Sequence, residues 1–307
     1  MKKYRPEGIL FDTKQNRKYM ESMNGLRECF FTEKILEAKV TLCDNEHNLH
    51  VDLGVMEGVI PREECAIGIS DGTVRDIAIV SRVNKPVCFK IVDFMDDEMG
   101  NRTAILSRRQ VQEECMENYI KNLSPGDVIE ARVTHNETFG SFCDIGCGIS
   151  ALLPIDSISV SRIPHPNVRF SVNTIIKAVV KGIDEMGRVT LSLKELLGTW
   201  EENASNFRAG QTVGGIVRSI ERYGVFIELS PNLAGLAEYT DDVEEGDSAS
   251  VYIKSINPEK MKIKLSIVDS FPEKGKPSPI KYYSNEEHIE SWQYSPTVCE
   301  KIIESVF

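Results

Sequence analysis

The sequence predicts a mainly β protein made of three tandem five-stranded barrels that are joined by helical linkers. Two observations support this fold class. First, the stretch that begins at Gly126 is repeated from Gly210, and a third, degenerate copy begins near Ile35. Second, each copy alternates apolar and polar residues over short runs, which is the pattern of half-buried strands. Self-similarity of this kind indicates that one supersecondary unit is used three times.

The copies share one order of elements. A valine-rich alternating strand leads into an aromatic-Gly-x-Phe step, a second alternating strand, a Gly-bearing turn and a short apolar run. After a polar, variable middle, each copy passes through a strand into a Leu-Ser exit, which ends at Arg109, Glu195 and Ser266. Five short strands in about 70 residues suit a small closed Greek-key barrel of the OB type, one face of which binds single strands.

The repeats also define the expected domains. We expect an N-terminal helical segment (1–33), a first, degenerate barrel (34–109), a helical linker (110–123), a second barrel (124–195), a linker (196–207), a third barrel (208–269) and a C-terminal linker with a helix (270–307). In the N-terminal segment, residues 14–31 carry an approximate apolar stripe. Ser107 and Ser192 are placed to cap the two linker helices.

The C-terminal end is expected to be helical after a Pro/Lys-rich linker at 271–283. Ser295 as N-cap and Pro296 in the first turn predict a short helix with Val298, Ile302 and Val306 on one face. Such a helix is too short to be stable alone, so it must dock on another surface. The third barrel, a partner protein and a second copy of the chain are the three alternatives.

Three motifs give the repeats a family resemblance. They are Tyr-Gly-x-Phe-x-x-Leu at 223–229 with its Gly-Leu step at 235–236, Ile-Asp-x-x-Gly-Arg-x-x-Leu-Ser at 183–192, and the Glu-Gly-Val-Ile-Pro step at 57–61. They resemble the S1 RNA-binding domain, the repeat of bacterial ribosomal protein S1, and the Trp-Glu linker at 197–217 resembles its inter-repeat segments. The resemblance covers residues 34–269, strongly in the second and third copies and weakly in the first. It implies OB-type barrels that bind RNA.

Strand alternation supports an RNA-binding face independently of this resemblance. Cys143 and Ile227 suit a barrel interior, which places their neighbours Phe142 and Phe226 on the outer face. Base stacking explains an aromatic ring on a wet face, because every base has a π-face. The alternative is that these rings merely cover a glycine or the mouth of the barrel.

The resemblance implies which residues contact RNA: two aromatics, the Asp of the Ile-Asp turn and the Arg that follows its Gly. Carried over by motif, these are Phe139, Phe142, Asp184 and Arg188 in the second repeat, and Tyr223, Phe226, Asn257 and Lys262 in the third. Alternation exposes Lys264 beside Lys262. In the first repeat, His47 and His50 occupy the aromatic positions. Histidine stacks weakly, so this repeat is expected to be structural or protein-binding.

The second repeat also has an unusual middle loop at 157–170. It places Arg162, His165 and Arg169 around two prolines. A stiff, cationic loop over the sheet is suited to clamp a phosphate. The alternative is a well-packed surface loop with solvated arginines.

Composition is consistent with a soluble, cytoplasmic protein. The 307 residues contain no apolar run long enough to cross a bilayer and no signal peptide at the start. The eight cysteines form no CxxC pair, so reduced and mostly buried thiols are expected. The net charge of −11 is unfavourable for phosphate binding, although lysines gather on the last strands of the third repeat. We therefore expect modest, salt-sensitive affinity.

The sequence thus predicts a non-catalytic protein that binds single-stranded RNA, either mRNA or rRNA, with low sequence specificity and a role near translation. It contains no phosphate loop, nucleophile elbow or HExxH motif, and Cys43, His47 and His50 are too few for a metal site. No enzyme activity, metal, cofactor or membrane partner is expected. One alternative is a scaffold that docks on the ribosome or another protein through the first repeat and the terminal helices. Another is an accessory subunit of an RNA-processing enzyme.

Overall fold

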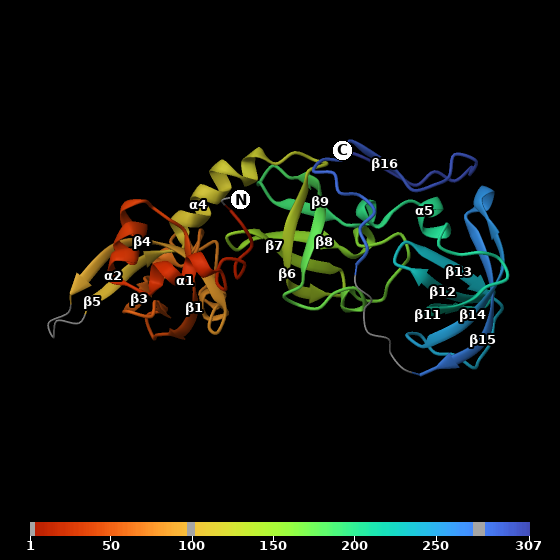
Figure 1. Ribbon diagram of the computed structural model, residues 1–307, viewed down its shortest axis with the longest axis horizontal. Helices are drawn as coiled ribbons and strands as arrows, with labels where there is room; N and C mark the ends of the chain where they lie inside the picture. Colours follow the sequence, from red (N-terminus) through yellow and green to blue (C-terminus); the bar gives the residue numbers. More distant parts are fainter. Residues whose placement is uncertain (1–3, 97–101, 273–279) are drawn as a thin grey trace. The chain divides into compact units, whose positions relative to one another are not determined.

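The computed structural model describes residues 4–96, 102–272 and 280–307 (Figure 1). The chain divides into two compact units. The first comprises the residues up to Leu123 together with Asp144–Ser150, and the second comprises Ser124–Cys143 and the residues from Ala151 onward. No helix in the described part of the chain is both long enough and apolar enough to cross a membrane.

The prediction of three closed five-stranded barrels is confirmed. The first contains β1 (Leu36–Cys43), β2 (Leu49–Asp52), β3 (Glu57–Ile60), β4 (Pro86–Asp96) and β5 (Arg102–Ser107). The second contains β6 (Val128–Glu137), β7 (Gly140–Gly146), β8 (Ile149–Pro154), β9 (Ile175–Ile183) and β10 (Val189–Ser192). The third contains β11 (Thr212–Glu221), β12 (Gly224–Ser230), β13 (Leu233–Ala237), β14 (Ser248–Asn257) and β15 (Lys262–Phe271).

All three barrels have the same topology. The third strand of each pairs in parallel with the fifth, and the fifth pairs antiparallel with the fourth, as in β8, β10 and β9. Alternation places the cores: along β6, Ile129, Ala131 and Val133 are buried, while Glu130 is exposed. Short helices fill the loops of the barrels: η1 (Arg62–Glu64), α3 (Ile77–Val80), η3 (Ile155–Ser157), η4 (Pro166–Val168) and η6 (Pro258–Lys260).

The N-terminal segment contains two helices, where one was expected. These are α1 (Lys14–Met20) and α2 (Met23–Phe31). Ser22 separates them, because its extended backbone and its side chain, which accepts a hydrogen bond from the Gly25 N–H, start a new helix. Gly25 then allows close packing, since a Cβ there would lie 2.3 Å from the Tyr19 carbonyl oxygen.

The first linker is helical as predicted, but its N-cap residue is Arg108 and not Ser107. The second linker departs further from the prediction. Ser107 Oγ accepts a hydrogen bond from the Gln110 N–H at the start of α4 (Arg109–Asn118), which η2 (Ile120–Asn122) follows. A single helix from Ser192 is wrong: the linker contains η5 (Lys194–Leu197) and α5 (Trp200–Ala204). Gly198 between them has a φ of 82°, which ends the first helix, and Thr199 caps the second.

The predicted C-terminal helix is also wrong. The segment instead forms a two-stranded antiparallel sheet of β16 (Ser291–Gln293) and β17 (Glu304–Val306). Its β-branched residues fit a strand better than a helix, and Ser295 accepts a hydrogen bond from the distant Ile303 N–H in place of an N-cap bond. Val298, Ile302 and Val306, which were expected on one face of that helix, are each exposed. Much of the expected Pro/Lys-rich linker, residues 273–279, lies outside the described residues.

One buried asparagine joins the parts of the second unit. Asn232, in the turn between β12 and β13, accepts a hydrogen bond from the Val160 N–H of the second barrel's loop at 3.0 Å. Its amide donates to the carbonyl oxygens of Lys194 and Gly198 in the linker, at 2.8 and 2.9 Å. Its own carbonyl oxygen accepts from the Tyr294 hydroxyl. The second barrel, the linker, the third barrel and the C-terminal segment therefore share one buried contact point.

The first unit encloses several buried carboxylates. Burial raises the pKa of Glu7, but Arg108 and Arg82 outweigh that effect and lower it to about 2. Burial and the nearby Glu7 charge together raise the pKa of Glu37 to about 8. Glu37 accepts hydrogen bonds from the backbone N–H groups of Gly8 and Phe11, both at 2.8 Å. The two buried carboxyls are thus held in opposite protonation states at neutral pH.

We expect Glu37→Gln to stabilise the first unit increasingly as the pH rises. Between 4.5, the ordinary pKa of the carboxyl, and about 8, the folded protein keeps a proton that the unfolded chain has released. The contribution of Glu37 to stability is therefore complete below pH 4.5 and is lost as the pH rises toward 8. Urea unfolding followed by circular dichroism measures the free energy of unfolding of the variant and the wild type at pH 5 and pH 8. The increase caused by Glu37→Gln should be larger at pH 8 than at pH 5 by more than about 1 kcal/mol, the value of one pKa unit. An equal gain at both pH values would mean that Glu37 is ionised in the folded protein.

Candidate nucleic-acid interface

The second and third barrels each carry the same pair of aromatic rings. Phe139 and Phe142 meet edge to face, with centroids 6.0 Å apart and planes at 87°. Tyr223 and Phe226 meet in the same way, at 6.0 Å and 89°. The first ring of each pair lies in the hairpin turn and is open to solvent, with 54% of Phe139 and 69% of Tyr223 exposed. The second ring, Phe142 or Phe226, is half-buried. Each pair therefore consists of one exposed ring and one ring that is held by its surroundings.

A glycine between the two rings makes this geometry possible. Gly140 and Gly224 have φ values of 155° and 151°. A Cβ at either position would lie 2.4 Å from a carbonyl oxygen of the next strand, that of Leu153 or Ala237. The hairpin therefore presses directly on the neighbouring strand, which any side chain at the glycine would prevent.

A carboxylate-ordered turn presents the arginine of the second barrel. Asp184 Oδ1 accepts hydrogen bonds from the N–H groups of Met186 and Arg188, both at 2.9 Å, and Oδ2 lies 2.6 Å from Arg188 Nε. These backbone and side-chain bonds from Arg188 lower the pKa of Asp184. The Arg188 side chain nonetheless remains largely exposed. Asp184 thus acts on the turn, while Arg188 faces solvent at the start of β10.

In the third barrel, strand register places a lysine on the aromatic face. Phe226 of β12 pairs with Leu236 of β13, and Leu236 pairs with Lys264 of β15. Residues that are paired across neighbouring strands point to the same side of the sheet. Phe226 and Lys264 therefore lie in one row, two strand spacings or about 10 Å apart.

Within the described residues, the turn before β15 has no acidic partner for its cation, Lys262. Asn257 Oδ1 accepts a hydrogen bond from the Lys260 N–H at 2.9 Å, and Met261 completes the turn with a φ of 48°. Lys262 pairs with Asn257 at the end of the ladder and is exposed. Asn257 therefore shapes this turn as Asp184 shapes its equivalent, but it adds no charge.

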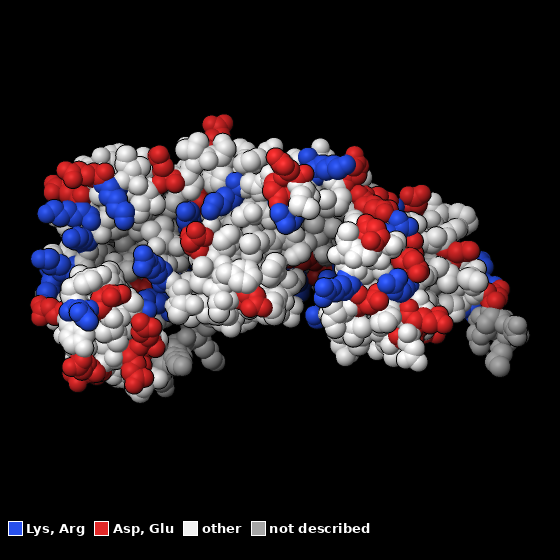
Figure 2. All heavy atoms as spheres, turned by 180° about the vertical axis from the view of Figure 1, so that it is seen from behind, with Lys and Arg blue, Asp and Glu red and all other residues white. Residues whose placement is uncertain are grey.

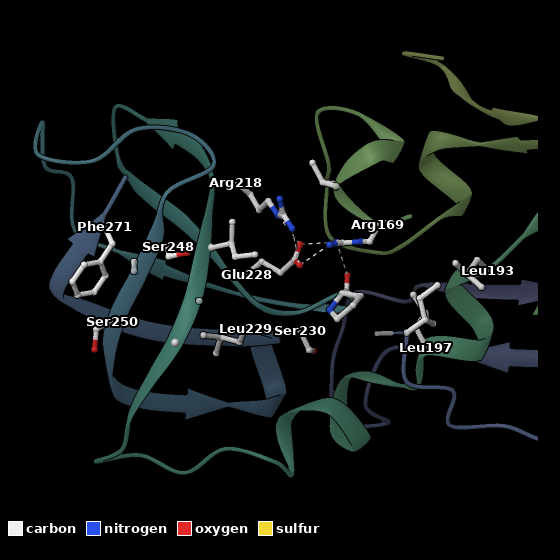
Figure 3. Close-up of a pocket in the computed structure, with 17 residues that line it drawn as sticks. Arg169, Leu193, Leu197, Arg218, Glu228, Leu229, Ser230, Ser248, Ser250 and Phe271 are labelled. Carbon is white, nitrogen blue, oxygen red and sulfur yellow. Dashed lines mark hydrogen bonds and ion pairs between the residues drawn. The ribbon is translucent and has the colours of Figure 1, made fainter. Parts of the chain in front are cut away.

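The prediction that Arg169, in the middle loop of the second barrel, helps to clamp a phosphate is wrong. This arginine is buried, and its Nη1 and Nη2 each lie 2.6 Å from an oxygen of Glu228 on β12 (Figure 3). Glu228 does point to the outer side of β12, as its neighbour Phe226 does, but the loop covers it. Arg162 is exposed, and His165 is half-buried with its Nδ1 accepting from the Asn167 N–H. A role of these two residues in RNA binding stays a prediction.

Two residues of this contact were not singled out from the sequence. Arg218 on β11 also binds Glu228, at 2.8 and 3.0 Å, and Asn232 holds the loop backbone. The sequence contained one signal of this contact: Glu228 shares the outer face of its strand with Phe226 and has no evident partner nearby in the sequence. Asn232 looked like an ordinary turn residue.

The two histidines of the first barrel are held by neighbouring groups. Burial lowers the pKa of His50, but its hydrogen bonds to Glu57 and Asp44, at 2.7 and 3.1 Å, raise it above the ordinary value. His47 lies in the turn before β2, with a φ of 65°. Among the described residues, neither histidine has a ring partner like those of the other barrels. The weaker role expected for this repeat stays a prediction.

Charge is mixed on the molecular surface. On the face in Figure 2, Lys and Arg side chains alternate with Asp and Glu and form no continuous basic stripe. In the third barrel, Lys254 is paired with Glu238 at 2.8 Å. Among the described residues, no group of three or more His, Cys, Asp or Glu is arranged to hold a metal ion. The face in Figure 2 therefore offers no continuous basic path to a nucleic acid.

Two of the three repeats match a known family. The sequence pattern of the S1 RNA binding domain matches residues 30–109 and 123–194. The small ribosomal subunit protein bS1 of Staphylococcus aureus (strain COL) is 29% identical over 304 residues, which covers 92% of this chain and 73% of that protein. The bS1 protein of Staphylococcus haemolyticus is 28% identical over 284 residues, covering 86% and 69%. A multidomain protein with nucleic acid binding domains from Streptococcus pneumoniae aligns at 13% identity with a TM-score of 0.26, covering 77% of this chain and 73% of that one.

Proposed function

This chain is an S1-domain repeat protein that resembles the ribosomal protein bS1, and from this premise we propose that it binds single-stranded RNA without catalysing a reaction. The second and third barrels stack bases on their aromatic pairs. Exposed cations beside these rings contact phosphates. Sequence preference is low, because a ring accepts any base.

One observation carries this proposal: the edge-to-face pair recurs with the same spacing and angle in two barrels. Side chains that only cover a glycine have no need to expose an aromatic ring at each hairpin. Each of these barrels also has an exposed cation on its last strand or the turn before it, Arg188 in the second barrel and Lys264 in the third. An exposed ring and a nearby cation are the two components of a surface that binds single strands.

The likeness to bS1 supports a place in translation, on the ribosome or on mRNA in the cytoplasm. The absence of catalysis is part of the same proposal. A protein-interaction scaffold is the second candidate function, because the apolar side chains of Val298, Ile302 and Val306 are exposed on the C-terminal segment.

Titration of a labelled, unstructured RNA of about a dozen nucleotides tests the proposal. About three phosphate contacts on a single strand give a log–log salt slope near −2, hence a loss of roughly twenty-fold in affinity between 50 and 200 mM salt. Saturable binding with this loss, measured by fluorescence anisotropy, would support RNA binding. No binding at 50 mM salt would favour the scaffold.

We expect Phe142→Ala and Phe226→Ala each to weaken RNA binding by about 1–3 kcal/mol, because each removes the fixed ring of an aromatic pair. The same anisotropy titration measures the change. Phe31→Ala is the matched control, since Phe31 is an exposed phenylalanine on α2 that belongs to the first unit and to neither aromatic pair. Wild-type affinity in both barrel variants, with the fold intact by circular dichroism, would exclude the proposed face.

A further inference from the structure

A cavity of about 550 Å³ lies between the middle loop of the second barrel, the second linker and the third barrel. Its size is in the range of small-molecule sites, which often occur where domains meet. Its walls are mainly apolar, and the larger side chains on them are Val168, Leu193, Leu197, Ile216, Leu229 and Phe271. None of the rings in the proposed RNA-binding pairs lines it.

One wall of the cavity carries a buried, unbalanced charge. The Glu228 carboxylate lies between the guanidinium groups of Arg169 and Arg218, which approach it at 2.6 and 2.8 Å. The exposed fractions of the three side chains are 6%, 5% and 8%. Two positive charges against one negative charge leave a net charge of +1 out of contact with bulk water. A buried charge of this kind favours an anion nearby.

The same wall also has an unused hydrogen-bond donor. Arg169 Nε is buried and has no hydrogen-bond partner in the described part of the chain. Buried polar atoms without a partner are uncommon in folded proteins, and an anionic oxygen would satisfy this one. A single anionic group could therefore both neutralise the net positive charge and accept the hydrogen bond from Arg169 Nε.

The third barrel leaves room for a ligand on the side of β11. Gly214 lines the cavity, and a Cβ built there meets no atom within 4 Å. It pairs with Ser250 of β14, so the strand continues normally past it. An apolar body can thus lie against bare backbone while its charged end approaches Arg169 and Arg218.

We propose that this cavity binds a small organic monoanion with an apolar or aromatic body. One negative charge neutralises the wall, and the apolar walls bury the remainder of the ligand. A cation is repelled by the net positive charge, and a neutral molecule leaves that charge and Arg169 Nε unmatched. The site is separate from RNA binding, so the two proposals can fail independently.

The probe for the test is anilinonaphthalene sulfonate, an aromatic monoanion that fluoresces when it leaves water. We expect saturable binding at one site per chain. Gly214→Leu fills the cavity and should weaken binding at least about tenfold, or 1.4 kcal/mol. Gly182→Leu is the matched control, because Gly182 on β9 is equally open but does not line the cavity, and it should bind as the wild type does. Equal binding by the Gly214 variant would place the probe elsewhere and overturn the proposal.

The charge requirement is tested separately. Arg218→Met leaves Arg169 and Glu228 as a neutral pair, so the net charge of the wall falls to zero, and we expect about tenfold weaker binding of the anion. Naphthalene, an uncharged molecule with the fused rings of the probe, should compete poorly with it. If Arg218→Met has no effect and naphthalene competes strongly, the cavity is a purely apolar pocket and the anion specificity is wrong. Thermal unfolding of each variant shows whether the fold is intact.

Discussion

Replacing Glu228 with glutamine is expected to lower the free energy of unfolding of the second unit by about 3–5 kcal/mol. The change removes the carboxylate that pairs with both Arg169 and Arg218, and it leaves two buried like charges that face each other. Both tryptophans of the chain, Trp200 and Trp292, are buried in this unit. Urea unfolding followed by tryptophan fluorescence therefore measures the effect directly.

The triple replacement Arg169→Met, Glu228→Leu and Arg218→Met provides the control. It removes every charge of the cluster and keeps similar side-chain volumes, so we expect stability close to that of the wild type or above it. If Glu228→Gln alone unfolds at the wild-type urea concentration, water or a bound ion must reach the cluster in solution. The burial described for these three side chains would then be incorrect.

A loss of similar size, about 3–5 kcal/mol, is expected in the first unit for Glu7→Gln. Glu7 binds the buried Arg108 through two hydrogen bonds, at 2.6 and 3.0 Å, and contacts Arg82 at 3.4 Å. Glutamine leaves both arginines without that charge. Since neither tryptophan lies in the first unit, circular dichroism should show an early unfolding step that tryptophan fluorescence does not.

An exposed ion pair is the appropriate comparison for this second prediction. Asp96 and Arg102 are 2.7 Å apart at the edge of the same barrel, and both remain accessible to solvent. Asp96→Asn should leave the unfolding midpoint almost unchanged, because water screens such pairs. If the Glu7 and Asp96 variants behaved alike, burial would not be the origin of the effect.

The barrels and the aromatic pairs were predictable because their causes are local. Two-residue alternation assigns each side chain to a face, and the glycine after Phe139 or Tyr223 fixes the hairpin that carries the ring. The alternation and the hairpin glycine each depend only on residues that are close together in the sequence, and both occur in more than one repeat. The sequence thus predicted both the strands and the exposure of their rings.

The features that were missed depend on contacts between distant segments. Arg169 has the sequence context of a surface loop, yet it meets Glu228, which lies 59 residues further along the chain. The C-terminal segment has acceptable helix signals, but pairing with residues before the turn at Ser295 satisfies its backbone instead. Propensity is a weak guide where tertiary packing supplies an alternative.

The single contact point at Asn232 has a consequence for any ligand that is long enough to reach both barrels of the second unit. Asn232 hydrogen-bonds the linker between these barrels to the third barrel. The distance between the two binding surfaces is therefore set before any ligand binds. Occupation of one surface then sets the effective concentration of a chain-like ligand at the other, without the entropic loss of a flexible tether. Affinity should therefore rise in a step as the ligand is lengthened. Asn232→Ala, which loosens the fastening, should turn that step into a gradual increase.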